Sequence, residues 1–325
     1  MRSTRYPPHT LEGHHKKDNS GHDHAGVGVL MAIGGFGWWA TITPLYYRVI
    51  DDVPIGELLA WRVISGLPAL WILLWMTRRL PEWWAALRDK RVLGILALSA
   101  VLIAINWIVF MWAVIDNRLS EASLGYYINP LFSVALGMVF LGERMRGAQW
   151  IAVALAGVGV GVLAWRLGGV PWISLTLAGS FGLHGLTRKL VGAAAAPGLA
   201  VEMLLLFPFM IVLLCMDHLE HGNTVIAGPW WVSTLLLLGG VVTIVPLVLF
   251  AGCTKRLRLS TVGLMQYIAP TGQLIMAVFL FGEDFGIERV IAFAFIWAAV
   301  ITYSIDSVRH ARGRNTPRVN VPGEA

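Results

Sequence analysis

The feature that most constrains this chain is a long apolar stretch that occurs twice, at residues 119–143 and 259–283. A shift of 140 positions superimposes the two copies, and a proline lies near the middle of each. Each copy is apolar for about 20 residues, the length at which a helix crosses the roughly 30 Å hydrocarbon core of a bilayer. The repeat therefore predicts two equivalent membrane-spanning helices. The identical pairs are Arg118/Arg258, Leu119/Leu259, Ser120/Ser260, Leu124/Leu264, Tyr127/Tyr267, Ile128/Ile268, Pro130/Pro270, Gly142/Gly282 and Glu143/Glu283.

Composition extends this prediction to the whole chain. Hydrophobic residues make up 57% of the 325 positions and charged residues only 14%, a balance too apolar for a water-soluble domain. The net charge of +6 does not indicate nucleic-acid binding, because the basic residues lie in short loops between apolar runs. We expect an all-α polytopic membrane protein with ten transmembrane helices. Their predicted ranges are 27–47, 55–76, 92–115, 120–141, 147–165, 171–190, 198–217, 230–252, 259–281 and 286–306.

The basic residues also predict the orientation of the chain. With a cytoplasmic N-terminus, 20 of the 25 Lys and Arg lie on the cytoplasmic side and four outside, and Arg62 alone lies within a span. A shift of 140 advances the chain by five helices, an odd number, so the two halves are inverted in the membrane. We expect a disordered cytoplasmic tail at 1–26, a five-helix repeat at 27–165, an inverted repeat at 166–306, and a cytoplasmic tail at 307–325.

The two central prolines predict a polar cavity between the halves. Proline lacks an amide hydrogen and displaces the carbonyl four residues earlier, which leaves an acceptor free at mid-membrane. Interrupted spans in matching halves are typical of a transporter's binding site. The alternative is that the prolines only bend the helices and that nearby polar groups bond neighbouring spans. The expected cavity residues are Tyr126, Tyr127, Asn129, Pro130, Gln266, Tyr267, Pro270, Thr271 and Gln273.

Three further residues inside spans are candidates for the same cavity. Asn106 either faces the cavity or bonds another helix, and Trp107 either stacks on an aromatic cargo or packs in the core. His184, the only histidine within a predicted span, is either a proton relay or a hydrogen-bonded packing residue. No Asp or Glu falls at mid-membrane, so the sequence does not support carboxylate-based proton coupling.

Charged residues near the span ends suggest gates. We expect Arg62 to pair with Glu121 near the outer face, and Glu202 to pair with Arg188 or Lys189 near the inner face. Such ion pairs would form and break as the two halves rock. The alternative is that these side chains reach the membrane interface and need no partner.

Several segments resemble one known family. EASLGYYINPL followed by LGMVFLGERMR is similar to the signature of the RarD proteins, bacterial permeases of the EamA branch of the drug/metabolite transporter superfamily. The segments ELLAWRVI, SAVLIAINWIVFMWAV, FGLHGLTRKL and RLRLSTVGLMQYIAPT extend the resemblance, which covers roughly residues 27–306. It implies the drug/metabolite transporter fold of two inverted five-helix repeats, with a central cavity lined mainly by spans 1, 3, 4, 6, 8 and 9. His184 occupies a position where this family leads us to expect Tyr.

The resulting functional prediction is a secondary transporter in the bacterial plasma membrane that exports a small organic metabolite or drug-like compound by alternating access. An intramembrane enzyme is a rival, but the sequence has no HExxH motif and no nucleophile paired with a base. A membrane sensor or assembly subunit is another. No cofactor and no metal site is predicted, because the histidines at 14, 15, 22 and 24 lie in the polar tail. The GxxxG spacing of Gly157 and Gly161 fits helix packing within one chain or a homodimer.

Overall fold

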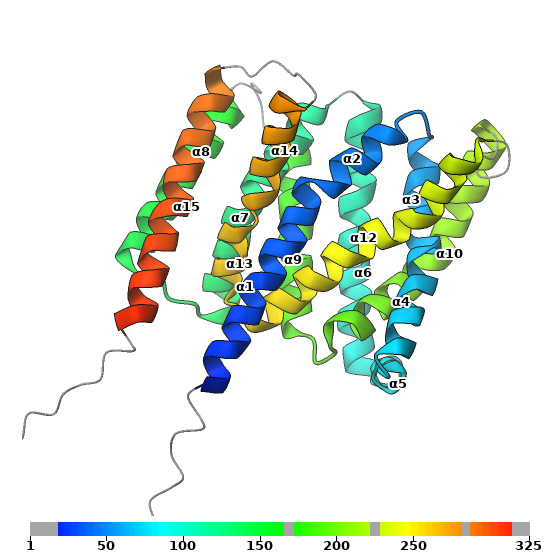
Figure 1. The fold of residues 1–325 in the computed structure, drawn as a ribbon, viewed down its shortest axis with the longest axis horizontal. Helices are drawn as coiled ribbons and strands as arrows, with labels where there is room; N and C mark the ends of the chain where they lie inside the picture. The colour runs from blue at the N-terminus through cyan, green and yellow to red at the C-terminus, as the bar shows by residue number, and fades with distance from the viewer. Residues whose placement is uncertain (1–18, 117, 166–171, 222–227, 281–286, 314–325) are drawn as a thin grey trace, which may run out of the picture.

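The computed structural model describes residues 19–116, 118–165, 172–221, 228–280 and 287–313, and every regular element in this described part is a helix. Figure 1 shows the helices as a bundle of steeply tilted rods. The helices are α1 (Asn19–Ala40), α2 (Ile42–Val49), α3 (Ile55–Ile64), α4 (Gly66–Met76), α5 (Leu80–Arg88), α6 (Lys90–Ile115), α7 (Leu119–Leu141), α8 (Gly147–Trp165), α9 (Trp172–Leu190), α10 (Ala195–His221), α12 (Trp230–Arg256), α13 (Leu259–Met265), α14 (Ile268–Phe279) and α15 (Ile287–Gly313).

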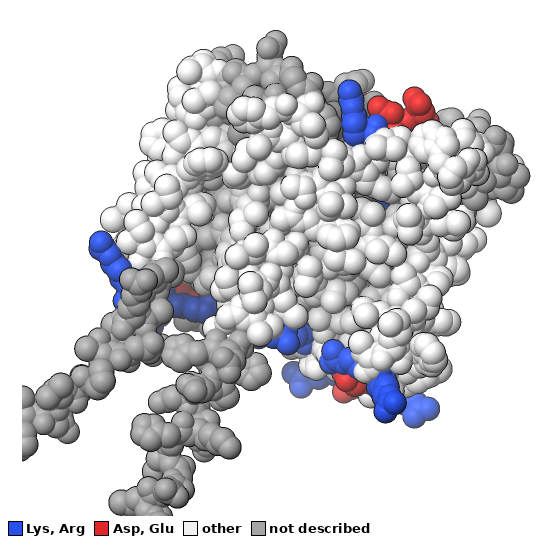
Figure 2. All heavy atoms as spheres, viewed as in Figure 1, with Lys and Arg blue, Asp and Glu red and all other residues white. Residues whose placement is uncertain are grey.

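The surface of this bundle matches a membrane environment. Six helical stretches in the described part are long and apolar enough to cross a bilayer, and Gly147–Val162 and Phe293–Asp306 are shorter apolar helices. Figure 2 shows Lys and Arg gathered at the edge that carries α5, and acidic side chains with further basic ones at the opposite edge. Uncharged surface fills most of the space between these edges. The prediction of an all-helical, multi-pass membrane protein is therefore confirmed.

The helices extend further than the apolar runs that predicted them. α1 begins at Asn19, so residues 19–26 are helical although we expected them in the disordered tail. α15 continues to Gly313, seven residues beyond the expected end of the last span. Hydropathy marks the part of a helix that needs lipid or protein around it, and a helix can continue past that part into water. Residues 1–18 and 314–325, with the histidines at 14 and 15, lie outside the described residues.

Three expected spans are each divided into two helices. The divisions fall at Thr41, at Ser65 and at Gln266–Tyr267, each close to four residues before a proline. Those prolines are Pro44, Pro68 and Pro270, whose rings displace the carbonyls at the ends of the preceding helices. The apolar runs had predicted one continuous helix in each place.

The division between α3 and α4 lets another helix approach closely. The Gly240 amide of α12 donates a hydrogen bond of 2.9 Å to the hydroxyl of Ser65. A Cβ on Gly240 would lie 2.2 Å from the Gly66 nitrogen, so this crossing requires glycine. α12 therefore runs across the point where the second span is interrupted.

The central helices pack in a cross-connected pattern. α7 contacts α9 and α13, α1 contacts α12 and α14, α6 contacts α9, and α8 contacts α15. Figure 1 shows α8 and α15 together at one side of the bundle and α3, α4 and α10 together at the other. The largest buried cluster joins α3, α4, α6 and α10 and includes Leu70, Leu96 and Met203. This scaffold places α7 and α13 in the middle of the molecule.

Candidate functional site

The two copies of the repeated stretch pack directly against each other as α7 and α13. A Cβ on Gly263 would lie 2.7 Å from the carbonyl oxygen of Pro130, so the helices meet where one has no side chain. The Tyr267 hydroxyl donates a hydrogen bond of 3.1 Å to the carbonyl oxygen of Tyr127. These two tyrosines are equivalent positions of the repeat. Pro130 is buried at this crossing, and Pro270, in the following helix α14, is also buried.

The crossing contains buried acceptors that lack partners. The Gln266 amide nitrogen donates a hydrogen bond of 3.2 Å to the Ser133 hydroxyl. The side-chain oxygens of Asn129 and Gln266 are buried and have no hydrogen-bond partner among the described residues. A buried acceptor without a partner costs about 1–3 kcal/mol, so a polar group of a ligand or water would gain free energy there.

Asn106 and His184 are occupied by bonds between helices. The Asn106 amide donates to the carbonyl oxygen of Leu177 at 2.9 Å and to the Ser180 hydroxyl at 3.1 Å, which fixes α6 to α9. His184 Nδ1 lies 2.9 Å from the Ser99 hydroxyl, again between α9 and α6. His184 is 2% exposed and its ring stacks on Phe250 with an interplanar angle of 14°. These contacts favour the packing alternative for both residues.

Arg62 lies in a setting that the sequence did not indicate. Its Nε donates a hydrogen bond of 3.1 Å to the Thr243 hydroxyl of α12, and its guanidinium lies 4.7 Å from the ring centroid of Trp107. The expected partner, Glu121, instead forms an ion pair of 2.5 Å with Arg118. Arg118 precedes Glu121 by three residues on the same helical turn, and this proximity explains the different pairing.

Charged residues at the end of α9 hold three helices together. Arg188 Nη1 and Glu202 Oε1 form an ion pair at 3.2 Å, with side-chain exposures of 0% and 1%. Arg188 also donates to the carbonyl oxygen of Ala195 at 2.7 Å. Lys189 bonds the carbonyl oxygens of Thr254 and Leu257 rather than Glu202. Because both charges of the pair are buried, removal of either one would leave the other without compensation.

The remaining expected cavity residues are more exposed. Tyr126 is 38% exposed, and its ring lies 6.0 Å from that of Phe110. The Thr271 hydroxyl accepts a bond of 3.3 Å from the Trp297 indole, and the Gln273 amide donates to the carbonyl oxygen of Trp39 at 2.9 Å. The structure thus groups Tyr127, Asn129, Gln266 and Tyr267 at the crossing, with Thr271 and Gln273 further along α14.

Glu143 also belongs to this centre, although it was not among the expected site residues. Its carboxylate accepts hydrogen bonds from the backbone amides of Leu259 at 2.7 Å and Ser260 at 3.0 Å. A residue just after α7 therefore caps the first turn of α13, where a negative charge is stabilised by the helix dipole. The signal was present, because Glu143 is identical in the two copies of the repeat.

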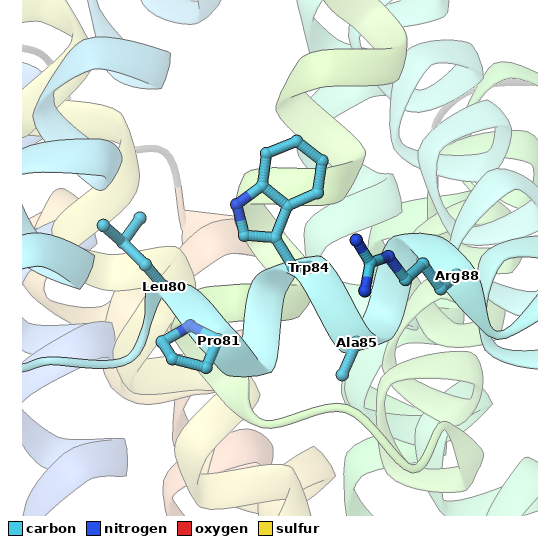
Figure 3. A pocket seen from close by; sticks show the side chains of 5 residues that line it. All are labelled: Leu80, Pro81, Trp84, Ala85 and Arg88. Carbon is cyan, nitrogen blue, oxygen red and sulfur yellow. The ribbon is translucent and has the colours of Figure 1, made fainter.

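A separate shallow hollow lies on α5, away from the crossing. Figure 3 shows its lining of Leu80, Pro81, Trp84, Ala85 and Arg88 along one short helix. Trp84 is 53% exposed, and Arg79 donates two hydrogen bonds of 2.9 Å to the Glu82 carboxylate. The bonds from Arg79 lower the pKa of Glu82 below its ordinary value. An exposed Trp beside Arg suits the interface between lipid and water, so this hollow is not a candidate for the cargo site.

The helical, multi-pass fold defines the class of polytopic membrane proteins, and the relatives of the chain are transporters. A solved crystal structure superimposes with a TM-score of 0.65 at 17% identity, covering 87% of this chain and 98% of that one. The RarD protein of Salmonella typhi is 41% identical over 281 residues, which are 86% of this chain and 95% of that protein. An uncharacterized transporter of Vibrio cholerae is 39% identical over 289 residues, with 88% and 95% covered.

The model of the EamA-like transporter family matches residues 26–165. The chain belongs to the EamA-like transporter family and is a homologue of the RarD proteins. The resemblance that the sequence motifs indicated is thereby confirmed. Membership in a family of transporters also confirms the prediction of a transporter rather than an intramembrane enzyme, the rival considered above.

Proposed function

We propose that the protein is a secondary transporter that exports a small organic metabolite or drug-like compound across the bacterial plasma membrane by alternating access. The observation that carries this proposal is the crossing of α7 and α13, where the buried Pro130 and the unpartnered amide oxygens of Asn129 and Gln266 lie. A site at such a position can be exposed to one side of the membrane at a time when the halves move relative to each other.

The pattern of helix contacts supports an inverted repeat. If spans 1 to 5 are equivalent to spans 6 to 10, every contact has a counterpart five spans later. The contact of α1 with α12 has its counterpart in α9 with α6, and that of α1 with α14 in α9 with α7. Likewise, α3 contacts α12 as α10 contacts α6. The pairs α7–α13 and α8–α15 relate equivalent spans to each other, as contacts on a two-fold axis do.

The proposed architecture has ten spans. Each of the divided spans, α1–α2, α3–α4 and α13–α14, counts once, and α5 lies in the interface. The limits of the two repeats, 27–165 and 166–306, follow from the shift of 140 positions. The gathering of Lys and Arg at the edge that carries α5 supports cytoplasmic termini through the positive-inside rule (Figure 2).

In the proposed mechanism the halves rock about the crossing, and contacts near the membrane faces form and break. The Arg188–Glu202 pair and the cap of α13 by Glu143 are the candidates for closing the cytoplasmic side. At the centre, Asn129 and Gln266 supply acceptors for polar groups of the cargo. The possibility of a homodimer through α8 stays a prediction.

The test is flux in proteoliposomes, after a screen of amino acids, nucleotide precursors and antibiotics has identified a transported compound. Asn129→Ala and Gln266→Ala are expected to lower the initial rate about tenfold, equivalent to about 1.4 kcal/mol of barrier. Gln149→Ala is the matched control, because Gln149 is an equally buried amide whose oxygen already accepts from the Arg146 backbone. Equal rates in all three variants, at normal abundance in the membrane, would place the site elsewhere. A reconstituted chain that moves no compound in the screen would favour the sensor or assembly subunit.

A further inference from the structure

Arg62 is a cation within a membrane span, closer to the start of that span than to its end, and it has no counter-charge among the described residues. It is half-buried in α3, within the apolar stretch Ile55–Met76. The structure gives its guanidinium no carboxylate partner among the described residues; its contacts are the Thr243 hydroxyl and the rings of Trp107 and Tyr47. An ionised side chain at this depth ordinarily pairs with an opposite charge or marks the path of a substrate.

The contacts that Arg62 makes neither neutralise its charge nor use all of its hydrogen-bond donors. A guanidinium has five N–H donors, and here one of them bonds a neutral hydroxyl. The face over Trp107 attracts the guanidinium, but a ring carries no net charge. The terminal amino groups form no hydrogen bond with a described residue, and carboxylate is the planar, bidentate acceptor whose geometry fits that edge.

The group of side chains around Arg62 includes rings from three other helices. Tyr126, from the central helix α7, is 38% exposed, and its ring lies 6.0 Å from that of Phe110 on α6, the helix that also carries Trp107. Helices α2, α3, α6, α7 and α12 each contribute one side chain to this group. The rings of Trp107 and Tyr47 lie 4.7 Å and 6.0 Å from the guanidinium and hold it in place.

We propose that the transported compound is an organic anion and that Arg62 binds its carboxylate. This inference rests on the proposed transport function and adds the charge of the cargo to it. Trp107 and Thr243 are positioning residues that orient the guanidinium. Arg62 therefore selects anionic compounds over neutral and cationic compounds of the same shape.

The test uses three probes with one ring system, which are indole-3-acetate (anionic), tryptophol (neutral) and tryptamine (cationic). Their binding to the full chain in detergent is measured by the shift in the thermal unfolding midpoint over a concentration series. At about ten times the dissociation constant, indole-3-acetate is expected to raise the midpoint by about 3 °C. Tryptophol and tryptamine are expected to cause no shift at the same concentration.

Variants assign the effect to one residue. Arg62→Gln is expected to weaken indole-3-acetate binding at least about tenfold, because it removes the charge and the fork. Arg62→Lys keeps the charge without the planar fork and is expected to bind with intermediate affinity, so it serves if Arg62→Gln does not fold. Arg118→Gln is the matched control, because it removes a cation that already has a partner, Glu121, and leaves this group intact.

Equal shifts from the three probes, or an unchanged affinity in both Arg62 variants, would overturn the inference. A shift caused by phosphatidylglycerol but not by indole-3-acetate would also overturn it and would assign Arg62 to a lipid headgroup. These outcomes are separate from those of the flux test. If a neutral or cationic compound is transported at a rate that does not depend on Arg62, the transport function is supported and the inference about Arg62 is overturned. If an organic anion binds at Arg62 but is not transported, the Arg62 site is supported and the transport function is not.

Discussion

The two copies of the repeated stretch carry the same proline and fold differently. α7 continues through Pro130 as one helix from Leu119 to Leu141, whereas the second copy is divided into α13 and α14 at Gln266–Tyr267, before Pro270. At the division, the amide of Ala269 donates to the carbonyl oxygen of Gln266, a bond three residues long instead of four. A proline thus removes one helical hydrogen bond in both copies, but only the second copy is divided into two helices there.

The contacts of the two copies explain this difference. Both side chains at the division point into the other copy, where Gln266 bonds Ser133 and Tyr267 bonds the Tyr127 backbone. The equivalent of Gln266 in the first copy, Tyr126, is partly exposed instead. A second proline pair behaves in the same way, because α4 starts near Pro68 whereas α10 is continuous through the equivalent Pro208. Tertiary contacts, not the proline itself, decide whether a helix is divided.

The largest effect is expected from filling the space between the copies. Gly263→Val would place side-chain atoms against the Pro130 carbonyl and is expected to cost about 1–3 kcal/mol or prevent folding. The measurement is the thermal midpoint of the detergent-solubilised chain. Gly157→Val is the control, because a Cβ there meets nothing within 4 Å. Equal midpoints for the two variants would show that α7 and α13 do not approach as closely as described.

The next largest effect is expected from replacing Pro270, and Pro130 is replaced for comparison. Pro270→Ala restores an amide that can bond the Gln266 carbonyl, which favours joining α13 to α14 and turns Gln266 and Tyr267 away from α7. We expect about tenfold slower flux, or about 1.4 kcal/mol of barrier. Pro130→Ala is expected to leave flux near the parent rate and to add about 1 kcal/mol of stability through one more helical bond. A larger loss of flux in Pro130→Ala would reverse the roles assigned to the two copies.

The smallest effect concerns the cap that joins the copies. Glu143→Gln keeps a hydrogen-bonding oxygen near the amides of Leu259 and Ser260 but removes the charge, so it is expected to destabilise by about 0.3–1 kcal/mol. The thermal midpoint measures this change. Glu283, the equivalent residue, lies outside the described residues. The thermal midpoint of Glu283→Gln tests whether this residue stabilises α7 in the same way. An unchanged midpoint in Glu143→Gln would show that the charge of Glu143 does not stabilise α13.

The sequence predicted the all-helical membrane fold well, because twenty-residue apolar runs can satisfy their backbones in lipid only as helices. It did not predict the divisions at Thr41 and Ser65, since Pro44 and Pro68 look no different from Pro208, which a helix accommodates. It suggested a pair between Arg188 and Glu202, which the structure contains, because both lie at the same end of neighbouring spans. It chose the wrong partner for Arg62, because the hydroxyl and rings that surround the guanidinium come from helices far apart in the chain.

The hydrogen bond from Tyr267 to Tyr127 has a consequence for motion. It joins two positions that are a whole repeat apart, so on the proposed architecture it lies on the pivot about which one half turns against the other. Points on a pivot keep their separation while distant points swing. A covalent cross-link at this pair would consequently leave turnover intact. A cross-link between Arg188 and Glu202, far from the pivot, would hold the protein in a single conformation.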